Sequence, residues 1–399
     1  MNPYPVYRSM ENRKEIVLRT LNCERAERIP CAPHWWGVYK YELSGRDYLH
    51  DAWTDGERLC RVYTDFFETF KPDWFHLHIG TPAWFKGSEI LTRDGTSYLI
   101  VDERMRPLKS ADRYFSVGSA EDEEIVDFPD YLLGSRCSRG RVDLTNRSRI
   151  EEYIKRFVHL DAETIVKLGY TDHVFPISEA YGDRVFINIH IPSAVCEIFD
   201  PHTGYVGFEQ GLLAFHDQPE GMGYLIQRCY EEQLQWARAF ASAGAHGFCI
   251  SESYISPDIA GSELYRDYLK PVHREYFGEI ARLGLIPLCN FWGDVNPLID
   301  DLAEIGIRGL MVEESKKSFT LEICDLLARL EGRVCMFGNL DSLSLLHDGT
   351  PEEIRSEVLR QMSCSKGGFI VANGSPITPG TPPANVRALI DSAKDGRLP

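Results

Sequence analysis

HGFCISE (residues 246–252) is the first of five short β-type runs that decide the fold of the second half of the chain. The next four runs are LIPLCN (285–290), RGLMVE (308–313), RVCMFGN (333–339) and GFIVAN (368–373). Each run is mostly apolar, and longer helix-type segments separate the runs. This alternation is typical of βα units, in which the strands lie parallel in one sheet.

The first half of the chain contributes three more runs of the same kind. They are RIPCAPH (28–34), DWFHLH (73–78) and RVFINIH (184–190), which brings the expected total to eight strands. No glycine-rich dinucleotide fingerprint follows the first run, so an open doubly wound sheet is disfavoured. We therefore expect an α/β fold, a (β/α)8 TIM barrel with its reaction site at the carboxyl ends of the strands.

The segments between the runs carry helix signals. TPEE (350–353) reads as a capping box with proline at the first helical position. A long amphipathic helix is expected before residue 246, because its apolar residues recur at helical spacing. These residues are Leu225, Ile226, Cys229, Trp236, Ala237 and Phe240.

One long stretch fits no βα unit. Residues 85–150, between the second and third strands, contain the hairpin-like TSYLIVDERMRPLKS (96–110) and acidic loops. Long loops on compact enzymes are usually functional lids. We expect residues 1–399 to form a single barrel domain, in which 85–150 is an inserted lid or capping segment.

The composition excludes several classes of protein. The 399 residues carry a net charge of −17, which argues against a nucleic-acid-binding protein. No apolar run is long enough to span a membrane, and no signal-type segment opens the chain. The 11 cysteines are scattered singly, as expected for thiols in a reduced compartment. The sequence thus predicts a cytoplasmic enzyme with no nucleic-acid or membrane partner.

Polar residues stand at nearly every predicted strand end, where barrel enzymes place their chemistry. Glu252 is a candidate general acid or metal ligand, and a carboxylate salt-bridged to a neighbouring strand is the alternative. His34, His76 and His190 are the other candidate catalytic residues. The candidate substrate-binding residues are Trp35, Trp36, His78, Asn290, Trp292, Glu313, Asn339 and Asn373.

Two pairs of these candidates allow more than one interpretation. Trp35 and Trp36 could form an apolar wall that stacks on a planar ligand, or they could belong to the core. His76 and His78 lie two residues apart on one strand face. That spacing suits two metal ligands or a proton relay, although a single pocket histidine is the simpler interpretation.

Four longer segments resemble the uroporphyrinogen decarboxylase superfamily. They are GAHGFCISES, SELYRDYLKPVHREYF, LIPLCNFWGDVNPLIDDLAEIG and VANGSPITPGTPPANVRALIDSA, all after residue 240. The resemblance implies a (β/α)8 barrel. It also implies one of two activities: decarboxylation of a tetrapyrrole, or methyl transfer with a corrinoid protein.

The chain departs from the motifs of both branches. The decarboxylases carry an arginine-bearing RQAGRY-like motif after the first strand, where this chain has APHWWGVYKYE and no arginine before Arg46. The thiol-methylating branch holds zinc by His-x-Cys and a later Cys, and the matching positions here are Asn290, Trp292 and Ser375. Cys289 is one residue out of register. We therefore predict no thiolate zinc site and name no metal ligands, while a different site from Glu252 and the histidines stays open.

The leading hypothesis is a methyltransferase, the demethylase component of a corrinoid-dependent system. It would move a methyl group from a small, aromatic methyl ether to a corrinoid carried by a partner protein. Glu252, helped by His34, His76 or His190, would assist the leaving atom. The alternatives are a cofactor-independent decarboxylase acting on a small carboxylated substrate, and a barrel that only binds a ligand or corrinoid.

Overall fold

A computed structural model describes most of the chain. It covers residues 12–35, 39–45, 56–80, 141–201 and 204–395, together with the backbone of five strands between residues 89 and 128. Trp36 lies outside these residues, so its predicted place in a pocket wall stays a prediction.

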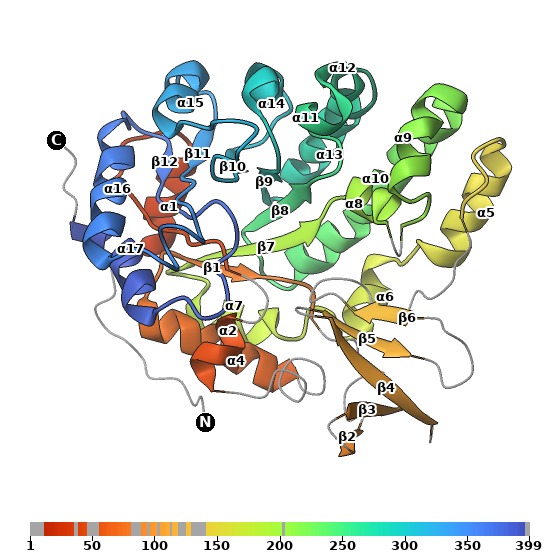
Figure 1. The fold of residues 1–399 in the computed structure, drawn as a ribbon, viewed down its shortest axis with the longest axis horizontal. Coiled ribbons are helices and arrows are strands. Elements are labelled where there is room, and N and C mark those ends of the chain that lie inside the picture. Colours follow the sequence, from red (N-terminus) through yellow and green to blue (C-terminus); the bar gives the residue numbers. More distant parts are fainter. Residues whose placement is uncertain are drawn as a thin grey trace.

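A curled, parallel, seven-stranded sheet forms the centre of the molecule, and helices cover its outer face (Figure 1). Its strands, in spatial order, are β1 (Trp74–Leu77), β7 (Phe186–Pro192), β8 (Gly247–Glu252), β9 (Ile286–Phe291), β10 (Gly309–Val312), β11 (Cys335–Phe337) and β12 (Phe369–Ile370). The α/β class and the parallel sheet are confirmed, and the arrangement is that of a TIM-barrel-like fold.

The predicted first strand, residues 28–34, is the exception, because it forms a single bridge instead of a strand. Cys31 pairs with Val371, beyond the end of β12. On the other side, the carbonyl of Cys31 accepts a hydrogen bond of 2.9 Å from the N–H of Asp73, just before β1. Pro30 and Pro33 flank this bridge and have no N–H to donate, which limits the ladder. The segment nevertheless connects the two edges of the sheet.

The helices follow the expected alternation. They are α1 (Arg13–Leu21), α2 (Tyr39–Ser44), α4 (Gly56–Phe70), α5 (Arg147–Phe157), α6 (Ala162–Lys167), α7 (Val174–Tyr181), α8 (Ala194–Phe199), α9 (Phe208–Asp217), α10 (Pro219–Ser242), α11 (Pro257–Ala260), α12 (Ser262–Leu264), the π-helical η1 (Tyr265–Leu269), α13 (Lys270–Arg282), the 3-10 turn η2 (Asn296–Leu298), α14 (Ile299–Ala303), α15 (Ile323–Leu330), α16 (Pro351–Ser363) and α17 (Pro383–Asp395). The predicted capping box begins α16, where Thr350 accepts from the N–H of Glu353 and the Glu353 carboxylate accepts in return. Among the described residues, no helix has both the length and the apolar character needed to cross a membrane.

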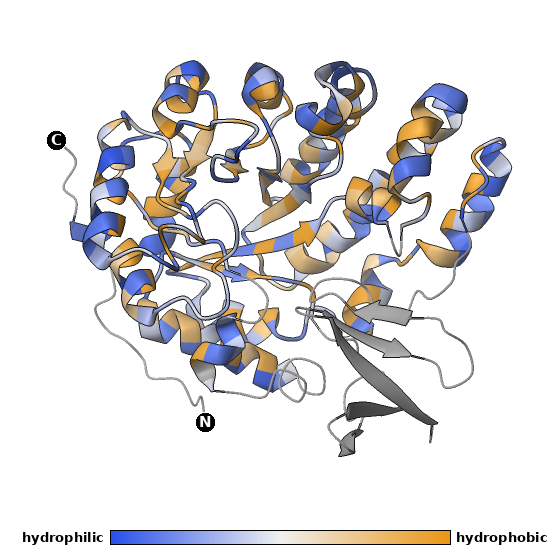
Figure 2. Ribbon diagram, in the orientation of Figure 1, coloured by the Kyte–Doolittle hydropathy of each residue, from blue (hydrophilic) through white to orange (hydrophobic). Residues whose placement is uncertain are grey.

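The apolar core has two layers. The larger layer lies between the sheet and the helices, whose surfaces carry both hydrophobic and hydrophilic residues (Figure 2). The smaller layer fills the inside of the curled sheet, with Trp74, Phe186 and Leu288 among its members. Val17 and Leu21 of α1 join this inner layer, so α1 covers the amino-terminal end of the sheet. The carboxyl ends of the strands and the loops after them, here called the mouth, are left for polar residues.

A second sheet lies within the predicted insertion. β2 (Glu89–Arg93), β3 (Thr96–Val101), β4 (Arg104–Ala111), β5 (Tyr114–Gly118) and β6 (Ile125–Phe128) pair antiparallel in chain order. The pairing of β3 with β4 confirms the hairpin expected at residues 96–110. The single-domain organisation and the capping role of residues 85–150 stay predictions.

Two cysteines depart from the expectation of scattered thiols. Cys324 on α15 and Cys364 after α16 form a disulfide, with their Cα atoms 5.3 Å apart. They are 40 residues apart in the chain, so cysteine spacing alone does not reveal the pair.

Candidate active site at the carboxyl ends of the strands

Three of the predicted histidines meet inside the mouth. His34 follows the Cys31 bridge, His76 lies on β1 and His190 lies on β7, and each is at most 1% exposed. One imidazole nitrogen from each lies within 4.8 Å of the other two, close enough to hold a metal ion together. We call His34, His76 and His190 the histidine cluster. Strand alternation explains it, because His76 and His190 point inward like Trp74 and Phe186 earlier on the same strands.

Hydrogen bonds extend the histidine cluster to β8. His76 Nε2 lies 2.7 Å from His190 Nδ1, and His190 Nε2 lies 2.6 Å from the Ser251 hydroxyl. Asn290 Nδ2 and Trp292 Nε1 approach the same hydroxyl at 3.5 and 3.4 Å. The Trp292 ring centroid is 6.2 Å from that of His34. The structure thus brings Asn290 and Trp292 to the histidines, as expected for residues lining one mouth.

Burial keeps these imidazoles neutral. It lowers the pKa of His34 to about 4, although the Gly374 carbonyl and the charge of Glu314 oppose the shift. Burial also lowers the pKa of His76 and of His190 well below the usual range, and the neighbouring imidazoles add to the effect. At neutral pH the histidine cluster therefore offers lone pairs and neutral N–H groups, and it holds no extra proton to give to a leaving group.

His78 shares the inward face with His76, as the spacing predicts, but it bonds elsewhere. The two ring centroids are 4.7 Å apart. His78 Nδ1 lies 3.2 Å from the Tyr63 hydroxyl on α4. Its side chain lies at the edge of the histidine cluster.

Asn373 and Gly374 hold His34 in place. The Asn373 side chain accepts from the N–H of His34 at 2.9 Å and donates to the His34 carbonyl at 2.7 Å. The Gly374 carbonyl lies 3.0 Å from His34 Nδ1. A Cβ at Gly374 would lie 2.3 Å from the backbone nitrogen of Glu314, so this close approach requires glycine. Asn373 is thus a residue that positions His34.

The remaining strand-end residues tie the loops of the mouth together. Glu313 accepts from the N–H of Gly293 at 2.5 Å, and burial raises the pKa of Glu313. Asn339 donates to the carbonyls of Glu313 and Leu321 at 3.2 and 3.0 Å. Lys316 pairs with Glu313 at 3.3 Å and also with Glu314. The structure gives Glu313 and Asn339 bonding partners within the loops.

The Glu252 side chain points away from the histidine cluster. Its neighbour Ser251 faces the histidine cluster, so strand alternation turns Glu252 toward the helices. There it accepts hydrogen bonds from Tyr230 of α10, from His273 Nε2 of α13 at 2.9 Å and from the Ser193 hydroxyl at 3.0 Å. The structure does not bring Glu252 together with the histidine cluster, and its partners lie on α10, on α13 and just after β7.

Trp35 also belongs to the core. Its ring stacks on Phe66 of α4, with centroids 3.8 Å apart and planes 12° from parallel. Tyr63 meets it edge-on at 5.4 Å. The Trp35 side chain lies between the sheet and α4, where it is 1% exposed, so it cannot form a pocket wall in this arrangement.

The residues of this chain do not fit the thiolate zinc site that the resemblance implies for the thiol-methylating branch. Asn290, Trp292 and Ser375 stand where its ligands are expected, and Ser375 donates both its N–H and its hydroxyl to Glu314 at 2.7 Å. Cys289 is buried in the outer layer of the core. None of these groups offers the thiolates that such a site requires.

Ser251 and Glu314 are the two residues that sequence reasoning missed. The period of two along residues 246–252 groups Ser251 with Cys249 on one strand face, although the sequence does not show that this face points inward. Glu314 lies one residue beyond the predicted strand end and carried no comparable signal.

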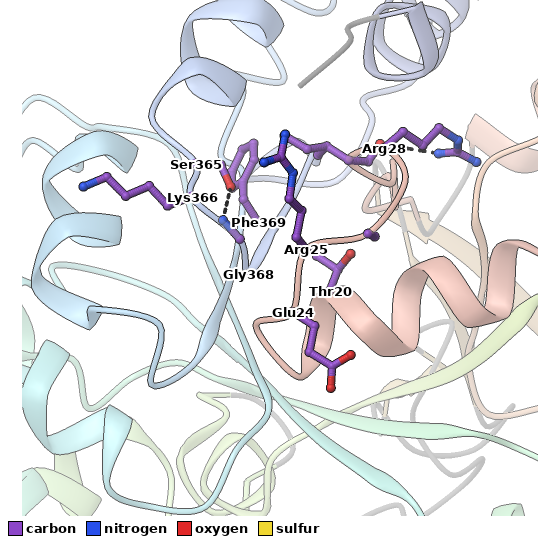
Figure 3. Close-up of a pocket in the computed structure, with 11 residues that line it drawn as sticks. Thr20, Glu24, Arg25, Arg28, Ser365, Lys366, Gly368 and Phe369 are labelled. Atoms are coloured by element: carbon purple, nitrogen blue, oxygen red, sulfur yellow. Dashed lines mark hydrogen bonds between the residues drawn. The ribbon is translucent and has the colours of Figure 1, made fainter. Parts of the chain in front are cut away.

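A separate cavity lies at the opposite end of the sheet. It measures about 290 Å³, and Figure 3 shows Arg25, Ser365 and Lys366 among the residues that line it. These residues precede the Cys31 bridge and β12, so the cavity opens at the amino-terminal ends of the strands. Arg28 in its wall is paired with Asp73 at 2.7 Å. The cavity is therefore distinct from the mouth.

Comparison with known proteins connects part of this chain to two enzyme types. The methylcobamide:CoM methyltransferase MtaA of Methanosarcina barkeri is 27% identical over 165 residues, which are 41% of this chain and 46% of that protein. A uroporphyrinogen decarboxylase of Xylella fastidiosa is also 27% identical, over 192 residues, which are 46% of this chain and 51% of that protein. The match thus spans about half the length of these relatives, and identity does not separate the two activities.

The fold comparison extends over the whole chain. A methyltransferase from Methanosarcina mazei superposes with a TM-score of 0.67 at 18% identity, covering 97% of this chain and 99% of that one. This likeness shows a shared fold. The family model described as uroporphyrinogen decarboxylase (URO-D) matches residues 203–396. The predicted resemblance to the uroporphyrinogen decarboxylase superfamily is therefore confirmed over residues 203–396, which match that family model.

Proposed function

We propose that this chain is an enzyme that transfers a methyl group between a small substrate and a corrinoid carried by a partner protein. The similarity to methylcobamide:CoM methyltransferases carries the proposal. The corrinoid would supply the cobalt that takes or gives the methyl group. The mouth is the proposed place of reaction, because barrel enzymes place their chemistry at the carboxyl ends of the strands.

The donor that we propose is an aromatic methyl ether. Trp292 supports this choice, because its indole lies beside His34 at the mouth and could contact a planar ring. When the methyl group leaves, the electron pair of the broken bond stays on the ether oxygen, which then needs a hydrogen bond, a proton or a Lewis acid.

The histidine cluster is the proposed partner of that oxygen. Its imidazoles are neutral, so an imidazole N–H would have to leave its present partner, as His190 Nδ1 would leave His76 Nε2, to donate a hydrogen bond to the developing charge, and water would supply the final proton. Glu252 could influence this step only from a distance, because its carboxylate is bonded to residues of α10 and α13. We therefore assign the leaving-group role to the histidines and a structural role to Glu252.

The decarboxylase alternative has less support at the mouth. A polycarboxylate needs cationic partners. Lys316, the cation at the described strand ends, is already paired with Glu313 and Glu314. Lys40 is buried beside Tyr63 and could bind a single carboxylate. The decarboxylase alternative is therefore tested with a small substrate that carries one carboxylate.

The test follows methyl transfer from a panel of methoxylated aromatics to a reduced corrinoid protein, read from the cobalt spectrum. His190→Gln should lower turnover by about 100-fold, as for loss of a group that assists the leaving atom. His216→Gln is the matched control, because His216 is 92% exposed on α9 and should behave as the wild type. Release of CO2 from a carboxylated substrate, without methyl transfer from any donor, would overturn the proposal in favour of the lyase.

A further inference from the structure

We infer that His34, His76 and His190 form a binding site for one divalent transition-metal ion of the zinc type. The three side chains come from separate parts of the fold, the Cys31 bridge segment, β1 and β7, and all three are buried. None of them occupies a thiolate position of the related methyltransferases. They also lie outside residues 203–396, the part of the chain that matches the family model.

The rings of His34 and His76 are each held by a hydrogen bond from Nδ1, the nitrogen away from the proposed metal. His34 Nδ1 lies 3.0 Å from the Gly374 carbonyl, so Nδ1 carries the proton and Nε2 the lone pair. His76 Nδ1 lies 2.9 Å from the Trp35 carbonyl, a shorter contact than the 3.3 Å to the Trp35 N–H, so its lone pair is also on Nε2. Histidines that bind metals are oriented in this way, by donating the remote N–H to a carbonyl or carboxylate.

His190 completes the pattern through Ser251. In the hydrogen-bonded arrangement, His190 Nδ1 donates to His76 Nε2 at 2.7 Å, and the Ser251 hydroxyl donates to His190 Nε2 at 2.6 Å. A metal on Nδ1 would require the other tautomer, whose Nε2–H donates to the same Ser251 oxygen. A hydroxyl both donates and accepts, so Ser251 can support either state without moving.

The spacing suits a tetrahedral ion. With metal–nitrogen bonds of about 2.0–2.1 Å, ligand nitrogens in a tetrahedral site lie about 3.3 Å apart. The observed separations begin at 2.7 Å between His76 and His190 and stay within 4.8 Å for the whole set. Small ring rotations therefore bring three nitrogens to bonding distance.

The local chemistry selects the type of ion. Three neutral imidazoles suit zinc and its neighbours, whereas magnesium and calcium prefer oxygen ligands. Metal binding at His190 Nδ1 moves the proton of that ring to Nε2, which then donates it in a hydrogen bond to the Ser251 oxygen. Three protein ligands leave a fourth position for water or for an oxygen or sulfur atom of a substrate, as in catalytic zinc sites.

The test measures metal directly, so its outcome is independent of the proposed methyl transfer. The full chain is stripped with a chelator, dialysed and titrated with Zn²⁺ by calorimetry and with Co²⁺ by visible absorption. We expect one equivalent per chain and the intense visible bands of four-coordinate cobalt. Less than a tenth of an equivalent of either ion, roughly the level of adventitious metal on a chain with no preformed ligand set, would overturn the inference.

Variants locate the metal. His34→Gln, His76→Gln and His190→Gln should each weaken Zn²⁺ binding by about 100-fold or more, and Ser251→Ala by about 10-fold. His216→Gln, on the exposed surface of α9, should bind as the wild type does. Binding that survives all three cluster substitutions, or that His216→Gln removes, would overturn the assignment. If a cluster variant does not fold, the wild-type stoichiometry and Ser251→Ala decide.

Discussion

Two buried tyrosines on neighbouring helices provide a matched test of how Glu252 is held. Tyr230 of α10 and Tyr276 of α13 pack edge to face, with ring centroids 5.0 Å apart, and each is at most 2% exposed. The Tyr230 hydroxyl donates to the Glu252 carboxylate and also contacts His273 Nε2 at 2.9 Å. The Tyr276 hydroxyl has no hydrogen-bond partner among the residues that the structure describes.

Tyr230→Phe should lower the free energy of unfolding by about 2 kcal/mol. A buried hydrogen bond to a charged group contributes about 1.5–3 kcal/mol, and Glu252 keeps its bonds to His273 and Ser193 in the variant. A loss of 2 kcal/mol corresponds to about a 30-fold change in the equilibrium constant for unfolding.

Tyr276→Phe removes the same atom from a similar environment and should cost nothing. Deleting a buried hydroxyl that lacks a partner also removes its desolvation penalty, so the variant should match or exceed the wild type in stability. Urea titration followed by circular dichroism and tryptophan fluorescence measures both. Equal losses in the two variants, or a loss below about 0.5 kcal/mol for Tyr230→Phe, would refute the argument that the hydrogen bond to Glu252 is what matters.

Three other changes test separate parts of the molecule. Glu252→Gln should lower the free energy of unfolding by about 1–3 kcal/mol, because the amide N–H would face the donors Tyr230, His273 and Ser193. Turnover should be retained, and a variant with wild-type stability but lost turnover would contradict this expectation. Lowering the pH from 6.5 to 4 should destabilise the wild type more than His246→Gln. Burial and then Lys14 lower the pKa of His246 to about 4, so between these pH values the unfolded chain binds the proton more readily than the folded chain. In thermal melts, the extra loss of unfolding free energy in the wild type should approach about 3 kcal/mol at pH 4 and vanish above pH 6.5, and identical pH profiles for the two proteins would argue against it. Cys324→Ser opens the bond to Cys364 and should cost up to about 4 kcal/mol for a loop of this length, an effect that dithiothreitol should reproduce in the wild type; a melting curve unchanged by either treatment would rule the bond out as a stabilising element.

The sequence predicts the parallel sheet because apolar runs of strand length repeat between helix-type segments. The first run fails as a strand because Pro30 and Pro33 remove backbone donors, and a count of apolar residues does not register that loss. The capping box at Thr350 and Glu353 is local in the chain, and it was predicted correctly. Signals of this kind can be read from the sequence because the groups that interact are neighbours in the chain.

The site is harder to predict because these strands are buried on both faces. In a strand with one wet face, polar residues mark the solvent side, but here Ser251 and Glu252 are both buried, one inside the sheet and one under the helices. The pattern of hydrophobic residues then carries no information about which face a polar side chain takes. The same ambiguity affects Trp35, which lies between the sheet and α4.

The division of the chain into a matched and an unmatched half bears on how its activity should be assigned. Residues 203–396 match the family model and include Ser251 and Trp292 of the mouth, and the relatives of this chain include both methyltransferases and decarboxylases. The histidine cluster comes entirely from residues before 203. A fold can host many chemistries, and the reacting groups decide among them. The experiments that distinguish the proposed activities should therefore target His34, His76 and His190 first, because these buried side chains meet at the mouth. The low pKa values of the buried imidazoles mean that the histidine cluster has no acidic proton to give to a leaving oxygen at neutral pH. A metal ion found there would assist that oxygen as a Lewis acid instead.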